Sequence, residues 1–157
     1  MAAQPIPDGY HTVSPYLAVD DAEKAIEYYT KAFGAKETVR MDGPDGRIGH
    51  AELKIGDSLV MLSDPFPQAS TTPPKELGGT SSSIFMYVED VDAVVQKAVD
   101  AGATVTMEVE DQFWGDRFGS ITDPFGHNWS IATHVEDLTP EEIEARGKAA
   151  MAAMTSA

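Results

Sequence analysis

The feature that most constrains the fold is an internal repeat, because one supersecondary unit occurs twice in the 157 residues. In the first copy an apolar strand ends at Val19, an amphipathic helix follows, and Gly34 stands where a left-handed helix C-terminus belongs. In the second copy Val88 and Gly102 take these places, 69 and 68 residues further along. A repeat of this size predicts two similar modules that pack into one fold.

The repeat continues into a β-hairpin in each copy. The stretches GRIGHAELKIGDSLVML (46–62) and DRFGSITDPFGHNWSIA (116–132) each contain a strand, a turn at a glycine and a returning strand. Each module is therefore expected to run β-α-β-β-β, which gives an α+β fold. The modules cover residues 10–63 and 81–136, and a connector rich in Pro, Gly, Ser and Thr joins them at 64–80.

Helix starts are indicated by capping residues. Asp20 is expected to cap the helix of the first module and Asp90 the helix of the second. Thr139, followed directly by a proline and three residues later by a glutamate, predicts a C-terminal helix over 138–155. We expect this helix to pack on the domain or to contact a partner.

The charge balance limits the partners. The 26 acidic residues against 11 basic ones give a formal charge of −15, so we expect neither a nucleic acid nor an anionic membrane as partner. The chain has no cysteine, which excludes disulfides, thiolate metal sites and cysteine nucleophiles. It shows no signal peptide and no apolar run that could span a bilayer, so a cytoplasmic location is expected.

Strand parity predicts which side chains face away from the helices. Alternate residues of a strand point to opposite faces, so Leu17 and Val19 should pack on the helix and leave Tyr16 on the open face. The other side chains expected on the open faces are Ser14, Ala18, His50, Glu52, Lys54, Ser83, Phe85, Tyr87, Ser120, Asn128, Ser130, Ala132 and His134. Aromatic and hydroxyl groups together suit a flat organic ligand. The alternative is that the aromatic side chains fill a closed core.

Two further segments lie near these faces. The stretch QFWGDRFG (112–119) is expected to form a rim with Trp114 as a lid, and Asp116 and Arg117 there are expected to form a local ion pair. His127 follows the turn of the second hairpin, in the place that Asp57 takes in the first. This position favours a structural role for His127 over a catalytic one.

Two stretches, YLAVDDAEKAIEYYTKAFGA (16–35) and DPFGHNWSIATHVEDLTPEE (123–142), carry a family resemblance. Together with the repeat, they make residues 10–140 resemble the vicinal oxygen chelate superfamily, in the PhnB-like branch of its glyoxalase/bleomycin resistance/dioxygenase group. The resemblance implies modules that curl into a cup-shaped mixed sheet, and homodimers whose cavities are built from paired modules. It also implies a divalent metal held on the first and last strands of each module.

The ligand positions that the resemblance implies are filled by unsuitable side chains. Counting from the motifs, they fall on Ser14, Ser83 and Ser130, and the repeat offset of 70 adds Val60, or Met61 if the register differs by one. Hydroxyls and aliphatic groups are poor ligands for zinc, iron or nickel. We therefore expect no metal and no other cofactor. A divalent metal is expected only if this interpretation of the four positions is wrong.

Three functions stay open. The first is metal-free binding of a small, planar organic molecule in a dimeric cup lined by the open-face residues, Val60 and Trp114. The second is a lyase, isomerase or dioxygenase of the same superfamily, with an unconventional metal site or with His50 and Glu52 as an acid–base pair. The third is an interaction role in which the C-terminal helix makes the contacts.

Overall fold

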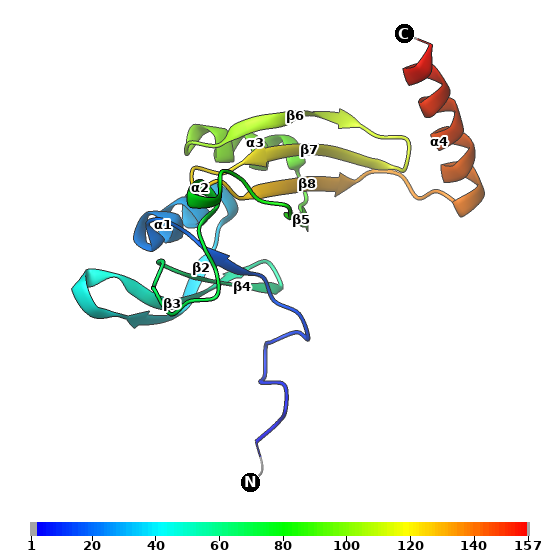
Figure 1. Cartoon of the computed structure of the whole chain (residues 1–157). Coiled ribbons are helices and arrows are strands. Elements are labelled where there is room, and N and C mark those ends of the chain that lie inside the picture. The colour runs from blue at the N-terminus through cyan, green and yellow to red at the C-terminus, as the bar shows by residue number, and fades with distance from the viewer. Residues whose placement is uncertain (1–2, 157) are drawn as a thin grey trace.

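The computed structural model describes residues 3–156 and contains two four-stranded mixed sheets (Figure 1). The first module consists of β1 (Tyr16–Ala18), α1 (Ala22–Phe33), β2 (Lys36–Asp42), a 3-10 turn (Pro44–Gly46), β3 (Ile48–Ile55) and β4 (Ser58–Ser63). The second module consists of β5 (Ser83–Tyr87), α3 (Val91–Asp100), β6 (Thr104–Asp111), β7 (Asp116–Thr122) and β8 (Asn128–His134). The connector carries α2 (Pro74–Leu77), and α4 (Pro140–Thr155) ends the chain.

The two sheets have the same topology. Their strand orders are β1-β4-β3-β2 and β5-β8-β7-β6. In each sheet the first pair is parallel and the other two are antiparallel. The predicted α+β fold of two βαβββ modules with a C-terminal helix is confirmed.

The start of α1 differs by one residue from the prediction. Asp21, not Asp20, is the N-cap, and its Oδ1 accepts the backbone N–H of Lys24 at 3.1 Å. Asp20 instead forms an ion pair with Lys75 of α2 at 2.9 Å. Gly34 ends α1 with a φ of 66°, as predicted for a left-handed C-cap.

The two helices lie between the two sheets. Each covers one face of its own sheet, α1 contacts α3, and the buried side chains of both modules form a single core cluster. In Figure 1, α1 lies between the sheets. The opposite faces of the sheets are therefore uncovered and point away from each other, and Tyr16 and Tyr87 on these faces are 43% and 62% exposed.

Asp123 links the two modules from the turn between β7 and β8. Its carboxylate accepts hydrogen bonds from the Tyr29 hydroxyl of α1 at 2.6 Å and from the Trp129 indole at 2.9 Å. It also accepts the backbone N–H groups of Phe125 at 2.9 Å and His127 at 3.0 Å. One buried carboxylate thus fixes the turn and joins it to the helix of the other module.

His127 adds a second link between the modules. Its Nε2 lies 2.8 Å from the backbone carbonyl oxygen of Ala18 at the end of β1. The side chain therefore points to the first module and not onto an open sheet face, in agreement with the structural role that its position favours.

The C-terminal helix α4 begins with the predicted capping box of Thr139 and Glu142. Figure 1 shows that it projects from one end of the second sheet. Arg146 binds Glu136 through two contacts of 2.8 Å, and Gly147 packs against Phe113. Among residues 3–156, no helix combines the length and the apolar character that a membrane span needs.

Candidate functional site

The open face of the first sheet carries a chain of hydrogen bonds, and we call its four residues Tyr16, His50, Glu52 and Met61 the first wall. The Tyr16 hydroxyl lies 3.0 Å from His50 Nδ1, and His50 Nε2 lies 3.0 Å from Glu52 Oε1. The other carboxylate oxygen of Glu52 accepts the Tyr10 hydroxyl. β1, β3 and the N-terminal segment therefore converge on one carboxylate.

Glu52 stays ionised at neutral pH although only 7% of it is exposed. Burial raises the pKa of its carboxyl, but the hydrogen bonds from Tyr10 and His50 outweigh burial, so the pKa is lowered overall. The same contact with Glu52 raises the pKa of Tyr10. An ionised Glu52 can only accept hydrogen bonds, so it fixes the ring proton of His50 on Nε2.

The open face of the second sheet carries a similar hub, and we call Phe85, Tyr87, Trp114, Asp116 and Phe118 the second wall. Asp116 Oδ2 accepts the Tyr87 hydroxyl at 2.9 Å and the Trp114 indole N–H at 3.0 Å. Burial raises the pKa of Asp116, but the hydrogen bonds from His134, Tyr87 and Trp114 outweigh it, and the net pKa is lowered. The predicted ion pair with Arg117 is absent, because Arg117 faces α3 and pairs with Asp92 at 2.7 Å.

His134 holds its proton between two carboxylates. Its Nδ1 lies 2.8 Å from Asp116 and its Nε2 lies 3.0 Å from Asp137, and these contacts, first that with Asp116, raise the pKa of His134. A raised folded-state pKa stabilises the fold fully below the unfolded pKa of about 6.5 and no longer does so once the pH exceeds the folded pKa.

We therefore expect the stability difference between the wild type and His134→Gln to shrink as the pH rises through the folded pKa of His134. Urea unfolding across this pH range gives the difference, and an NMR titration of the ring gives the pKa. Asp137→Asn should lower that pKa and move the transition to lower pH. A difference that does not change with pH would contradict the assigned role.

The aromatic side chains of the second wall form a layer on the sheet. The rings of Phe85 and Phe118 lie 5.8 Å apart at an angle of 17°, and Trp114 meets Phe118 edge to face at 5.9 Å. Phe85 also contacts Tyr87 at 5.2 Å and remains 50% exposed. Phe118 was missed from the sequence, although it shares strand parity with the predicted Ser120.

The positions implied for metal ligands lie beside these walls, with one correction. Val60 is 4% exposed and packs in the core opposite Leu53, so it does not reach the open face. Met61 is in register with Tyr16 and takes the fourth position. The predicted offset of 70 came from the hairpin glycines, but the second hairpin is one residue longer between paired positions: Glu52 pairs with Met61, nine residues on, and Ser120 with Ser130, ten residues on.

The serines make hydrogen bonds among themselves. Ser83 Oγ lies 3.0 Å from Ser130 Oγ, and Ser120 is in register with Ser130 on the neighbouring strand. Ser14 lies two residues ahead of β1. Three hydroxyls and the thioether of Met61 do not fit the divalent metal of the superfamily. Across residues 3–156, no group of three or more His, Asp or Glu side chains is placed to hold a metal ion.

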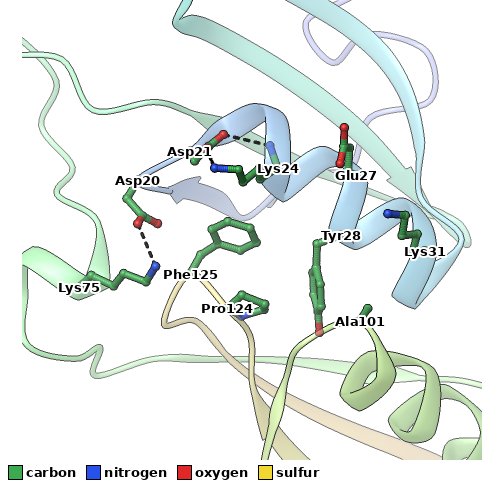
Figure 2. A pocket seen from close by; sticks show the side chains of 10 residues that line it. All are labelled: Asp20, Asp21, Lys24, Glu27, Tyr28, Lys31, Lys75, Ala101, Pro124 and Phe125. Atoms are coloured by element: carbon green, nitrogen blue, oxygen red, sulfur yellow. Dashed lines mark hydrogen bonds and ion pairs between the residues drawn. The ribbon is translucent and has the colours of Figure 1, made fainter.

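Two cavities lie outside the centres of the walls. One, of about 450 Å³, is formed by α1, α2 and the β7–β8 turn, and Figure 2 shows Lys24 and Lys75 of its lining directed at acidic neighbours. Lys75 pairs with Asp20 at 2.9 Å and Lys24 with Asp21 at 2.7 Å, so these charges are already matched. A groove of about 1140 Å³ runs between β5 and the β3–β4 hairpin and includes Phe85 of the second wall.

Residues 10–131 match the model of the glyoxalase/bleomycin resistance protein/dioxygenase superfamily. The chain belongs to this superfamily. An uncharacterised protein of Mycobacterium tuberculosis is similar to this chain. The two are 49% identical over 136 residues, which cover 85% of this chain and 80% of the relative.

Solved structures of the superfamily agree with this assignment. TioX from Micromonospora sp. ML1 matches with a TM-score of 0.63 and 26% identity over 80% of this chain and 99% of its own. A PhnB protein from Bacillus cereus matches with a TM-score of 0.62 over 78% of this chain and 99% of its own. Its identity of 18% supports a common fold alone. The PhnB-like resemblance read from the motifs thus extends to the fold.

Proposed function

We propose that the protein binds a small, planar organic molecule in a cup formed by two copies of the chain, without the divalent metal of its superfamily. The observation that carries the proposal is the open aromatic layer of the second wall, where Phe85 and Phe118 are nearly parallel and Phe85 is half exposed. Aromatic side chains that stay accessible beside fixed polar groups suit a flat ligand, since rings stack on the layer and polar groups orient it.

Two copies would complete the cup, because the groove within one chain reaches the second wall only at Phe85 and Tyr87 of the edge strand β5. The helices lie between the sheets, so the first and second walls of one chain point away from each other. A homodimer that sets the first wall of one chain opposite the second wall of its partner would enclose a ligand between the imidazole–carboxylate pair and the aromatic layer. The superfamily's own description includes bleomycin resistance proteins, which agrees with a binding role.

The test is a thermal-shift screen with planar probes such as 2-naphthol, quinoline and acridine, since a ligand that binds the folded state raises Tm. We expect at least one probe to stabilise the wild type, and Phe118→Ala to weaken its binding about tenfold through the lost ring contact. Phe66→Ala is the matched control, because Phe66 contacts Arg47 away from both walls. Equal losses in both variants, or no stabilisation by any probe, would contradict the proposal.

The dimer and the metal-free state are tested separately. Sedimentation should give the mass of two chains, and elemental analysis of protein purified without chelators should give no stoichiometric zinc, nickel, iron or manganese. A stoichiometric metal would contradict the reading of the four ligand positions. The proposal includes a cytoplasmic location. It includes no nucleic-acid or membrane partner.

A second candidate function is acid–base catalysis by the first wall. It is favoured by the chain from the Tyr16 hydroxyl through His50 to Glu52, which resembles the hydroxyl–imidazole–carboxylate order used in proton transfer. Mass spectrometry of each stabilising probe after incubation would detect turnover. Turnover that persists in His50→Gln would exclude this pair as the catalyst.

A further inference from the structure

The hydroxyl proton of Tyr87 on the second wall is directed into the protein. Its oxygen lies 2.9 Å from Asp116 Oδ2, and an ionised carboxylate has no proton to give, so Tyr87 is the donor. Asp116 keeps its charge because its hydrogen bonds outweigh the effect of burial. The Tyr87 side chain is 62% exposed, so its remaining hydrogen-bonding capacity on the open face is that of an acceptor.

The hydroxyl of Tyr16 on the first wall also donates its proton into the protein, through a different set of contacts. Glu52 holds a ring proton of His50 on Nε2, so Nδ1 is an acceptor in the ring with a single proton. The Tyr16 hydroxyl, 3.0 Å from Nδ1, must therefore donate to it. The accessible lone pairs of Tyr16 can then only accept a hydrogen bond.

The serine pair beside the second wall also makes hydrogen bonds within the protein. Ser83 Oγ lies 3.3 Å from the carbonyl oxygen of Asn128, to which it can only donate, and 3.0 Å from Ser130 Oγ, where either hydroxyl can be the donor. The indole N–H of Trp114 is likewise occupied by Asp116. The Tyr16 and Tyr87 hydroxyls therefore offer lone pairs on the open faces while their protons bind inside the protein.

One lysine is an exception among these acceptors, because it is a cationic hydrogen-bond donor. Lys54 shares the face of His50 and Glu52 on β3 by strand parity and is exposed near the β3–β4 turn. Its ammonium group would attract an anion. A planar carboxylate is therefore the ligand class that competes with a hydrogen-bond donor.

We propose that the cup selects planar molecules with hydrogen-bond donors at their edge, such as phenols and aromatic amines, over ethers or carboxylates of the same ring size. This specificity rests on the proposed binding function and names its ligand class. Two tyrosine hydroxyls, Tyr16 of β1 and Tyr87 of β5, supply the acceptors. The net charge of −15 agrees with a neutral or cationic ligand.

The experiment compares 2-naphthol, 2-methoxynaphthalene and 2-naphthoate by calorimetry, at a mildly alkaline pH at which the naphthol keeps its proton. We expect 2-naphthol to bind about fivefold more tightly than its methyl ether, the amount one hydrogen bond supplies. Tyr16→Phe or Tyr87→Phe should bring the ratio of the two affinities closer to one, because each removes a hydroxyl that accepts from the naphthol. Tyr28→Phe is the control, since that hydroxyl lies between the helices, 3.4 Å from the Ala98 carbonyl oxygen.

The outcomes separate the two proposals. Equal binding of the naphthol and the ether would overturn the donor preference while the binding function stands. Tightest binding of the naphthoate would overturn it in favour of recognition by Lys54. If none of the three probes binds, the proposed function fails and the specificity fails with it. Nitrogen NMR gives a check that needs no ligand, because a neutral His50 with its proton on Nδ1 would also overturn the assignment for Tyr16.

Discussion

Replacement of Asp123 by alanine should lower the free energy of unfolding by about 3–5 kcal/mol. The carboxylate is 4% exposed and accepts four hydrogen bonds, from the side chains of Tyr29 and Trp129 and from two backbone N–H groups. Its removal leaves these donors buried without partners and loosens the contact between the modules. Urea denaturation followed by the fluorescence of the two tryptophans measures the loss.

Two variants control for this effect. Tyr29→Phe removes one donor and leaves the other three in place, so we expect a loss of about 1 kcal/mol. Asp57→Ala changes an exposed aspartate in the turn of the first hairpin and should alter stability by less than about 0.5 kcal/mol. A loss at Asp123 no larger than that at Asp57 would show that the links between the modules are not needed for stability.

Gly115→Ala is expected to have the second largest effect, a loss of about 3 kcal/mol or more. Gly115 has a φ of +96°, and a Cβ atom there would lie 2.3 Å from the backbone oxygen of Glu136. The backbone would have to move on both sides of the turn that presents Trp114 and Asp116. The second wall should therefore lose its ligand affinity together with stability.

Gly56→Ala measures the cost of a positive φ without the steric clash that is expected for Gly115→Ala. Gly56 also has a positive φ, +59°, but no atom lies within 4 Å of the position of its Cβ. Only the cost of the left-handed conformation, about 1 kcal/mol, is expected there. Similar losses in the two variants would mean that the β6–β7 turn yields to the added methyl group, contrary to the packing described. Differential scanning calorimetry of both variants provides the comparison.

The sequence predicted the architecture because the repeat and the strand period support each other. The two copies define the same module, and alternation along the strands correctly separates buried Leu17 and Leu53 from open-face Tyr16, His50 and Phe85. Such patterns are local, so they can be read in a short window. The open-face side chains of β1, β3 and β5 could therefore be named before the sheets were known.

The features that the sequence did not predict depend on the lengths of the hairpins and on contacts between residues far apart in the chain. The exchange of Val60 for Met61 follows from the strand register, because Tyr16 pairs with Met61 and Phe85 with Ser130, so the repeat offset on these strands is 69 and not 70. The hydrogen bond from Tyr29 to Asp123 joins residues that are 94 positions apart, so no pattern in a short window of sequence predicts it. Asp20 and Asp21 are neighbours with equal capping ability, and only the backbone conformation at Asp21 decides between them.

The placement of the helices between the sheets has a genetic consequence. In a dimer of the proposed kind, each cup takes one wall from each subunit. Consider one variant chain with a defective first wall and another with a defective second wall. When they are co-expressed, the mixed dimer has one cup with both defective walls and one cup with two intact walls. Two inactive alleles would thus complement each other, which a protein that builds its whole site from one chain does not allow.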